Sequence, residues 1–227
     1  MIVTSSIFRE YDIRGAYPQE LNEESIKHIA HAIAKKCKKE NIDFLVVGRD
    51  GRLSGPSLLD AFCCGLNESG INVKNIGLVT SPMLYFAAKK EISKSGVIIT
   101  GSHNPKNYNG IKMVINDESV SGSEILGLMS DVLSSSALEK GTLIYDDIKD
   151  IYLKEVVENI NLPKGDKLKV VLDCGNGAAG CIAPDLFKKL GCDVYELFSE
   201  VDGNFPNHHP DPGKVENLID LIDEVKN

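Results

Sequence analysis

The sequence predicts an α/β protein made of three-layer α/β/α domains, with sheets that are mixed but mostly parallel. Short runs of aliphatic and β-branched residues recur along the chain, among them 44–47, 73–79 and 97–100, and they suit buried strands. The segments between them carry apolar residues at helical spacing. This alternation of strands and helices is typical of sheets covered by helices on both faces.

The composition is that of a soluble globular protein. The 227 residues suffice for one large domain or two smaller ones, and we expect two, at 1–145 and 146–227. A net charge of −8 argues against nonspecific nucleic-acid binding, which relies on a basic surface. The apolar runs are strand-sized, so we predict no membrane span. Six cysteines without a CxxC pair, and no signal peptide, predict a reduced, cytoplasmic protein.

The first elements follow from local signals. Residues 7–15 suit a charged edge strand, and Asn22 is a candidate N-cap for a helix that runs to about Glu40. A buried strand at 44–47 leads into the polar segment GRDGRLSG, at the place where α/β proteins position ligand groups. Arg49 and Arg52 are its functional candidates, whereas Asp50 is expected to pair with one of them and fix the turn.

The remainder of the first domain continues the alternation. We expect a helix from Pro56 to Asn67, a strand over 73–79, a short helix ending at Lys90, strands at 97–100 and 111–115, and a closing helix over 121–136. The connection between the strands at 97–100 and 111–115 is too short for a parallel crossover. These two strands should therefore be antiparallel neighbours.

The polar loop between these two strands reads TGSHNPKNYNG and is the most distinctive stretch of the chain. Gly101 allows close approach of the backbone to a ligand, and Pro105 holds the turn open. Ser102 would be presented at the end of a strand. A serine hydroxyl needs help to react, and His103 and Lys112 are nearby groups that can provide it. Spacing alone leaves an ordinary polar loop as the alternative.

The second domain is expected to begin with a helix over 146–159, followed by a turn at 163–166. Strands at 168–172 and 194–197 flank DCGNGAAG and a helix that continues over 185–190, and a last helix covers 214–226. DCGNGAAG resembles a phosphate-binding turn but lacks the P-loop ending, and we interpret it as a packed turn. His208 and His209 are expected to be exposed loop histidines.

Five motifs in order resemble the α-D-phosphohexomutase superfamily, and the phosphomannomutase/phosphoglucomutase branch in particular. They are FREYDIRG, VGRDGRLSG, TGSHNP with YNGIKM, DCGNGAAG and DGNFPNH, spread from residue 8 to residue 208. Complete members of this family have four domains. The resemblance therefore implies an N-terminal portion, with the first domain and an incomplete second domain.

The resemblance also implies a function. Ser102 would carry a phosphoryl group between the 1- and 6-positions of a hexose phosphate through a hexose bisphosphate. Lys112 would stabilise charge and His103 would assist proton transfer, while Tyr11, Arg14 and Arg49 would line the substrate cleft. Mg²⁺ would bind the phosphate on Ser102 together with aspartates beyond residue 227, so we expect the 227-residue chain alone to be inactive without the missing C-terminal domains.

Two alternatives belong to other classes. A non-catalytic module that binds sugar phosphates would keep the loop without turnover. A serine hydrolase is disfavoured because the loop has no GxSxG motif.

Overall fold

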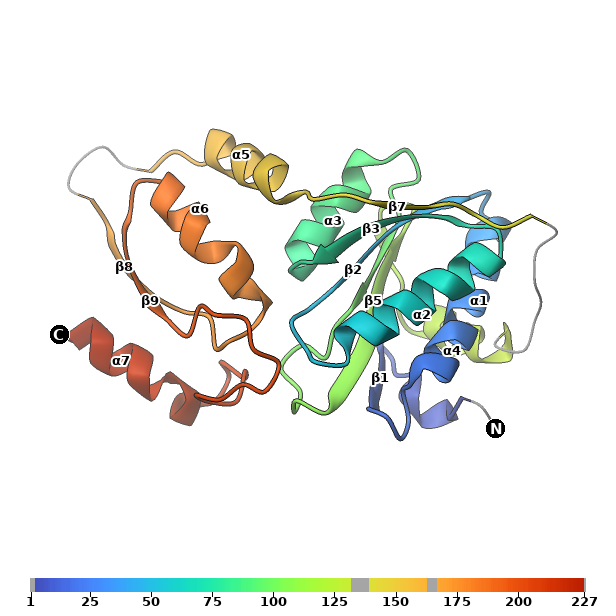
Figure 1. Cartoon of the computed structure of the whole chain (residues 1–227), viewed down its shortest axis with the longest axis horizontal. Coiled ribbons are helices and arrows are strands. Elements are labelled where there is room, and N and C mark those ends of the chain that lie inside the picture. Colours follow the sequence, from blue (N-terminus) through green and yellow to red (C-terminus); the bar gives the residue numbers. More distant parts are fainter. Residues whose placement is uncertain (1–2, 132–138, 163–166, 227) are drawn as a thin grey trace.

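The computed structural model describes residues 3–131, 139–162 and 167–226. It consists of a larger body with a central sheet and a smaller body with a short sheet (Figure 1). The described helices include none that is both long enough and apolar enough to cross a membrane.

The larger body contains a mixed, mostly parallel sheet with strand order β1-β5-β4-β2-β3-β7, and β6 pairs with β5. β2, β3, β4 and β7 run parallel, whereas β5 is antiparallel to both β1 and β4. The predicted antiparallel pairing around the polar loop is thereby confirmed. The strands are β1 (Ile13–Ala16), β2 (Phe44–Arg49), β3 (Asn72–Leu78), β4 (Gly96–Ile99), β5 (Tyr108–Ile115), β6 (Glu118–Ser119) and β7 (Leu143–Tyr145).

One face of this sheet is covered by α1 (Glu23–Lys39), α2 (Gly55–Glu68) and α4 (Ser123–Asp131). α1 begins as predicted, because the Asn22 side chain accepts from the Ser25 amide and the Ser25 hydroxyl accepts from the Asn22 amide. α2 lies unusually close to α1. A Cβ on Gly65 would come within 2.7 Å of the Lys27 carbonyl oxygen, so a glycine is required at this crossing.

The opposite face packs against α3 (Ser81–Lys90), and α5 (Lys149–Asn159) lies against α3 and adds Leu153 to the same apolar cluster. Successive residues of a strand point to opposite faces. Val47 and Ile99 therefore join the core under α1 and α2, while Val46 and Ile98 join the core under α3. This alternation determines which polar side chains at the strand ends share a surface.

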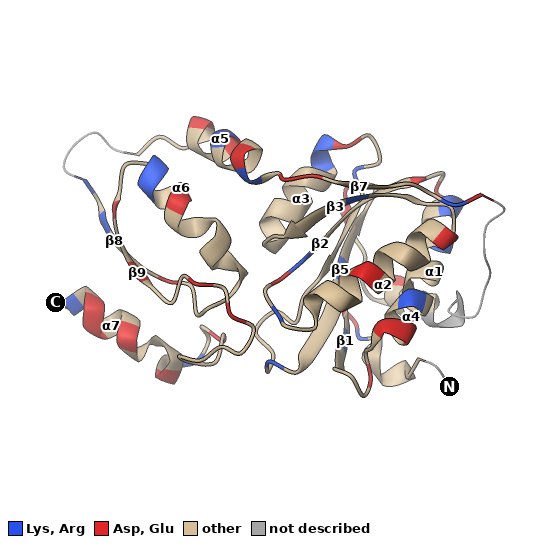
Figure 2. Ribbon diagram, in the orientation of Figure 1, with Lys and Arg blue, Asp and Glu red and all other residues tan. Residues whose placement is uncertain are grey.

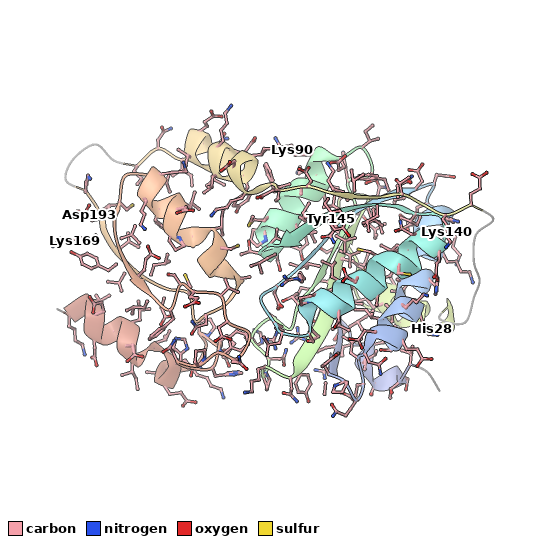
Figure 3. The ribbon with its side chains drawn as sticks, viewed as in Figure 1. His28, Lys90, Lys140, Tyr145, Lys169 and Asp193 are labelled. Atoms are coloured by element: carbon pink, nitrogen blue, oxygen red, sulfur yellow. The ribbon has the colours of Figure 1, made fainter. Side chains whose placement is uncertain are left out.

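The smaller body has two parallel strands, β8 (Lys169–Asp173) and β9 (Asp193–Leu197), connected through α6 (Ala183–Lys189). A 3₁₀ turn at Val215–Leu218 leads into α7 (Ile219–Lys226). Ile148, Leu153 and Ile182 share one apolar cluster with α3. The side chains that fill this region are drawn in Figure 3.

The structure departs from the sequence prediction at several elements, among them β7, α5 and α4. β7 was not predicted, because three residues carry too weak a pattern, yet it pairs with β3 and ends at the exposed Tyr145 (Figure 3). α5 begins at Lys149 rather than at 146, where the Asp147 carboxylate accepts from the Lys149 amide. α4 begins at Ser123, and the predicted continuation to residue 136 lies outside the described residues, as does the predicted turn at 163–166.

Candidate active site

The polar loop follows β4 at its carboxyl end and returns the chain into β5. It is a folded turn rather than an open excursion. The Asn104 amide and side chain both donate to the Gly101 carbonyl, at 3.0 and 2.9 Å, and the Tyr108 amide donates to the Pro105 carbonyl at 2.9 Å. We call residues 100–108 the serine loop.

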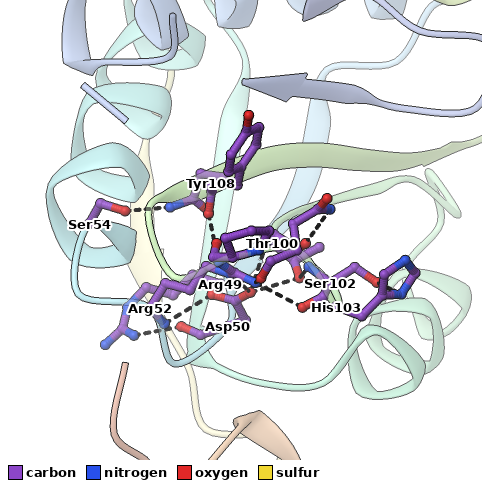
Figure 4. Close-up of polar contacts among 12 residues, drawn as sticks. Arg49, Asp50, Arg52, Ser54, Thr100, Ser102, His103 and Tyr108 are labelled. Carbon is purple, nitrogen blue, oxygen red and sulfur yellow. Dashed lines mark hydrogen bonds and ion pairs between the residues drawn. The ribbon is translucent and has the colours of Figure 1, made fainter. Parts of the chain in front are cut away.

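The Arg52 guanidinium lies beneath the serine loop and binds its carbonyl groups (Figure 4). Nη1 donates to Pro105 at 2.6 Å and to Tyr108 at 2.8 Å. Nη2 donates to Ser102 at 2.9 Å and to Asn104 at 2.8 Å. Only 1% of the Arg52 residue surface is exposed. Arg52, which the sequence analysis named as a functional candidate, is therefore a buried residue that supports the serine loop from inside.

The Asp50 carboxylate joins Arg52 to the start of the loop. Its Oδ2 accepts from Thr100 Oγ1 at 2.8 Å, from the Gly101 amide at 3.0 Å and from Arg52 Nε at 3.2 Å. Its Oδ1 accepts from the Arg52 amide. The prediction that Asp50 pairs with a neighbouring arginine to fix the turn is confirmed.

Ser102 is exposed and has a left-handed backbone, with φ at 51°. A non-glycine residue in this region costs roughly 1–3 kcal/mol and needs support from its surroundings. Here the Ser102 amide donates to Thr100 Oγ1 at 2.9 Å, and its carbonyl is bound by Arg52. His103 is exposed as well, and its Nδ1 lies 3.5 Å from Ser102 Oγ, which is long for a hydrogen bond.

Arg14 and Lys112 lie on the face of the sheet that carries Ile98 and α3. Arg14 is opposite Gly110, and Lys112 is opposite Ile98, so both side chains leave the same face. Both cations approach one carboxylate: Arg14 Nη2 donates to Asp12, and Lys112 Nζ lies 3.8 Å from Asp12 Oδ2. Arg14 Nε is buried without a hydrogen-bond partner among the described residues. Two cations share one anion, which leaves this group net positive.

Tyr11 and Arg49 are the other two residues that the resemblance assigned to the substrate cleft. Tyr11 precedes β1 and is 72% exposed. Arg49 comes two residues after Val47 and so faces α2, where its side chain packs against Gly55 and its Nη1 donates to the Asp50 carbonyl at 2.9 Å. Burial lowers the pKa of Arg49, against the effect of nearby carboxylates. Arg49 lines a hollow next to α2 that does not include Ser102.

Ser102 opens onto a cavity of about 170 Å³ between the two bodies. Its lining from the first body includes three residues that the sequence analysis did not single out for the site, Val79, Thr80 and Ser81. Thr80 and Ser81 follow the carboxyl end of β3, where α/β proteins place ligand groups, and this position is the signal that could have identified them. The second body contributes Gly177, Ala178, Phe205 and Pro210. DCGNGAAG, which we interpret as a packed turn, therefore also forms part of the cavity wall through Gly177 and Ala178.

His208 is not the exposed loop histidine that was predicted, and His209 is half-buried too. His208 Nε2 lies 3.0 and 3.1 Å from the two carboxylate oxygens of Asp173, and Nδ1 lies 3.0 Å from the His209 carbonyl. Burial opposes the charge of His208, but these acceptors outweigh it and raise the pKa. Asp173 and His208 are 35 residues apart, so the sequence carried no local signal of the pair.

The described residues contain no group of three or more His, Cys, Asp or Glu side chains that could hold a metal ion. Asp50 already accepts four hydrogen bonds, and Asp12 is occupied by Arg14 and Lys112. Acidic and basic residues are interspersed along the ribbon of both bodies (Figure 2). The positive group of Arg14 and Lys112 is thus a local feature of a chain with net charge −8.

Comparison with known proteins shows similarity in sequence to one protein family. The family model described as phosphoglucomutase/phosphomannomutase, alpha/beta/alpha domain I, matches residues 5–130, and the model for domain II matches residues 150–227. A phosphomannomutase/phosphoglucomutase from Pseudomonas syringae pv. tomato is 49% identical over 226 residues, which cover 99% of this chain and 48% of that protein. A phosphoglucomutase from Neisseria gonorrhoeae is 46% identical over 228 residues, covering 99% and 49%.

A solved structure agrees with these matches. The crystal structure of a phosphoglucomutase/phosphomannomutase family protein from Burkholderia thailandensis has a TM-score of 0.94 and 41% identity, and the match covers 99% of this chain and 50% of that one. The chain spans about half the length of the curated relatives it matches.

Proposed function

Because this chain belongs to the phosphoglucomutase/phosphomannomutase family, we propose that it supplies the phosphoryl-carrying serine of a phosphohexomutase, Ser102. The substrates are a hexose phosphate and a hexose bisphosphate, and the net reaction moves a phosphoryl group between the 1- and 6-positions. The observation that carries the proposal is the setting of Ser102. Its exposed hydroxyl faces a cavity, on a loop whose backbone is fixed from below by Arg52 and Asp50.

The chemistry is phosphoryl transfer to and from an oxygen nucleophile. When the bisphosphate donates, a bond forms between Ser102 Oγ and phosphorus while the bond from phosphorus to the sugar oxygen breaks. The hydroxyl proton ends on the sugar oxygen, and we assign His103 to relay it. Such transfers depend mainly on positioning and on charge stabilisation of the phosphoryl oxygens. Arg14 and Lys112, which share Asp12 as a counter-charge, are the cations we assign to this stabilisation.

Mg²⁺ is the cofactor we propose for the complete site, where it would neutralise charge on the transferring group. Magnesium requires several oxygen ligands. The described residues do not fit a full set, since Asp12 and Asp50 are engaged with protein donors, and only the phosphate oxygens of a phosphorylated Ser102 suit the ion. The steps assigned to Ser102, Arg14 and Lys112 do not depend on where the remaining ligands lie.

The free state of all six cysteines suits a reducing compartment, and we propose a cytoplasmic location.

Phosphorylation of Ser102 tests the proposal. The product of the complete reading frame is incubated with glucose 1,6-bisphosphate, and its mass and peptide map are measured. We expect one added phosphoryl group on the peptide that contains Ser102, and no addition in Ser102→Ala. Ser121→Ala, which changes a serine outside the cavity, should still accept the group.

Two results would contradict this assignment. Phosphate on Ser81, which lines the same cavity, would move the carrier to another residue. Saturable binding of glucose 1-phosphate without any phosphorylated serine would favour a non-catalytic module that binds sugar phosphates.

A further inference from the structure

We propose that Arg52 is a positioning residue for Ser102, one that fixes the backbone of the serine loop without touching the reacting atoms. The inference rests on the proposed function insofar as it concerns catalysis. Its structural part, that the loop takes its shape from Arg52, stands on the contacts alone.

The hydrogen bonding of Arg52 is complete. A guanidinium has five N–H donors in one plane. Nε binds Asp50, and the other four N–H groups have four carbonyl acceptors, all of them in residues 102–108. A lysine at this position has three donors around a single nitrogen and cannot satisfy the Asp50 carboxylate together with four carbonyls spread over the loop.

The shape of the loop agrees with this role. A Cβ on Gly101 would lie 2.2 Å from Arg52 Nε and Cζ, so the backbone of Gly101 rests directly on the guanidinium. Burial lowers the pKa of Arg52, but the Asp50 carboxylate opposes that effect. The loop can hold Ser102 in its left-handed conformation because both its amide side, through Thr100, and its carbonyl side, through Arg52, are bound.

Residues of the second body pack against Arg52 and its neighbour Leu53. The Phe205 ring lies 5.5 Å from Arg52 Cζ, and a Cβ on Gly203 would come within 2.6 Å of the Leu53 amide nitrogen. Arg52 is therefore enclosed between the serine loop and the 201–205 segment. Loss of the guanidinium would remove a hydrogen bond from each of four loop carbonyls, whereas the apolar core under α1 and α2 contains none of these carbonyls. The expected damage is local to the loop.

The test compares Arg52→Lys with Lys74→Gln in the product of the complete reading frame. Lys74 is a matched control because it is a mostly buried cation of the same domain, paired with Glu91 and Asp146 away from the loop. The measurements are hydrogen–deuterium exchange of peptides from 100–108 and from α1, the rate of Ser102 phosphorylation by glucose 1,6-bisphosphate, and kcat and KM for glucose 1-phosphate.

For Arg52→Lys we expect faster exchange confined to 100–108, with α1 unchanged, and a phosphorylation rate and kcat reduced by about 100-fold, the order of effect that misplacing a reacting group produces. KM should stay within about threefold, because Arg52 does not contact the substrate. Lys74→Gln should preserve exchange in 100–108 and the phosphorylation rate.

Three outcomes would overturn the inference: loop exchange in Arg52→Lys equal to that of the wild type, a phosphorylation rate close to that of the wild type, or a raised KM with unchanged kcat. If the wild type itself is not phosphorylated at Ser102, the proposed function fails. The exchange comparison still decides the role of Arg52 in the loop.

Discussion

The pairing of His208 with Asp173 predicts a pH-dependent contribution to the stability of the second domain. Both ring nitrogens of His208 face oxygen acceptors, so only the doubly protonated ring can donate at both positions. Asp220 adds a further negative charge nearby, and the Phe198 ring packs edge-on against the imidazole. The protonated state is favoured in the fold, and the pKa is raised from its ordinary value of about 6.5.

The magnitude follows from the burial of the pair. The side chain of His208 is 16% exposed and that of Asp173 is 5% exposed, so solvent screens their interaction weakly. Hydrogen bonds to charged groups contribute about 1.5–3 kcal/mol each. We expect His208→Gln to lower the free energy of unfolding by about 2 kcal/mol at about pH 6.

The sign of the pH dependence is fixed by the direction of the shift. The folded protein binds a proton on His208 more tightly than the unfolded chain does. The stabilisation is therefore fully present below the ordinary histidine pKa and is lost as the pH rises through the raised pKa. The difference between wild type and His208→Gln should shrink across that window.

Urea unfolding followed by circular dichroism over a pH series measures this difference. His209→Gln is the matched control, because it changes the adjacent histidine but keeps the backbone carbonyl that accepts from His208. A wild-type advantage over His208→Gln that stays constant with pH, or grows as the pH rises, would refute the reasoning.

Two further substitutions probe other parts of the first domain. Gly101→Ala should lower the free energy of unfolding by about 1–3 kcal/mol, because its Cβ would overlap Arg52. Gly127→Ala, with nothing within 4 Å of the added Cβ, should stabilise helix α4 by about 0.5–1 kcal/mol. Equal changes in the thermal unfolding midpoint of the two variants would contradict the close contact between Gly101 and Arg52. Burial lowers the pKa of His31, whose Nδ1 lies 2.7 Å from Ser69 Oγ. The stability that the neutral His31 contributes should therefore be lost as the pH falls below about 6.5, and the free energy of unfolding of His31→Gln should fall less than that of the wild type over that range. An equal fall in both proteins would exclude His31 as the cause.

Elements with strong local signals were predictable from the sequence. The Asn22 cap, the apolar spacing of α1 and the short connection between β4 and β5 each depend on residues close together in the chain. β7 escaped prediction, because three residues become a strand only when the edge of β3 is available to pair with them. The loop around Ser102 was identified from its motif, and the structure then supplied its hydrogen bonds.

The sequence by itself determined that Ser102 sits in a loop between two strands and that cationic residues lie in neighbouring motifs. The local pattern did not separate Arg49 from Arg52, which are three positions apart and chemically identical, and only the family resemblance favoured Arg49, for the substrate cleft. The tertiary structure separated them: Arg49 ends a strand on the side of α2, while Arg52 lies past the turn, under loop carbonyls that are 50 to 56 residues distant in the chain. The physical reason is that backbone carbonyls carry no sequence signature, so which arginine they enclose is decided only when the strands come together.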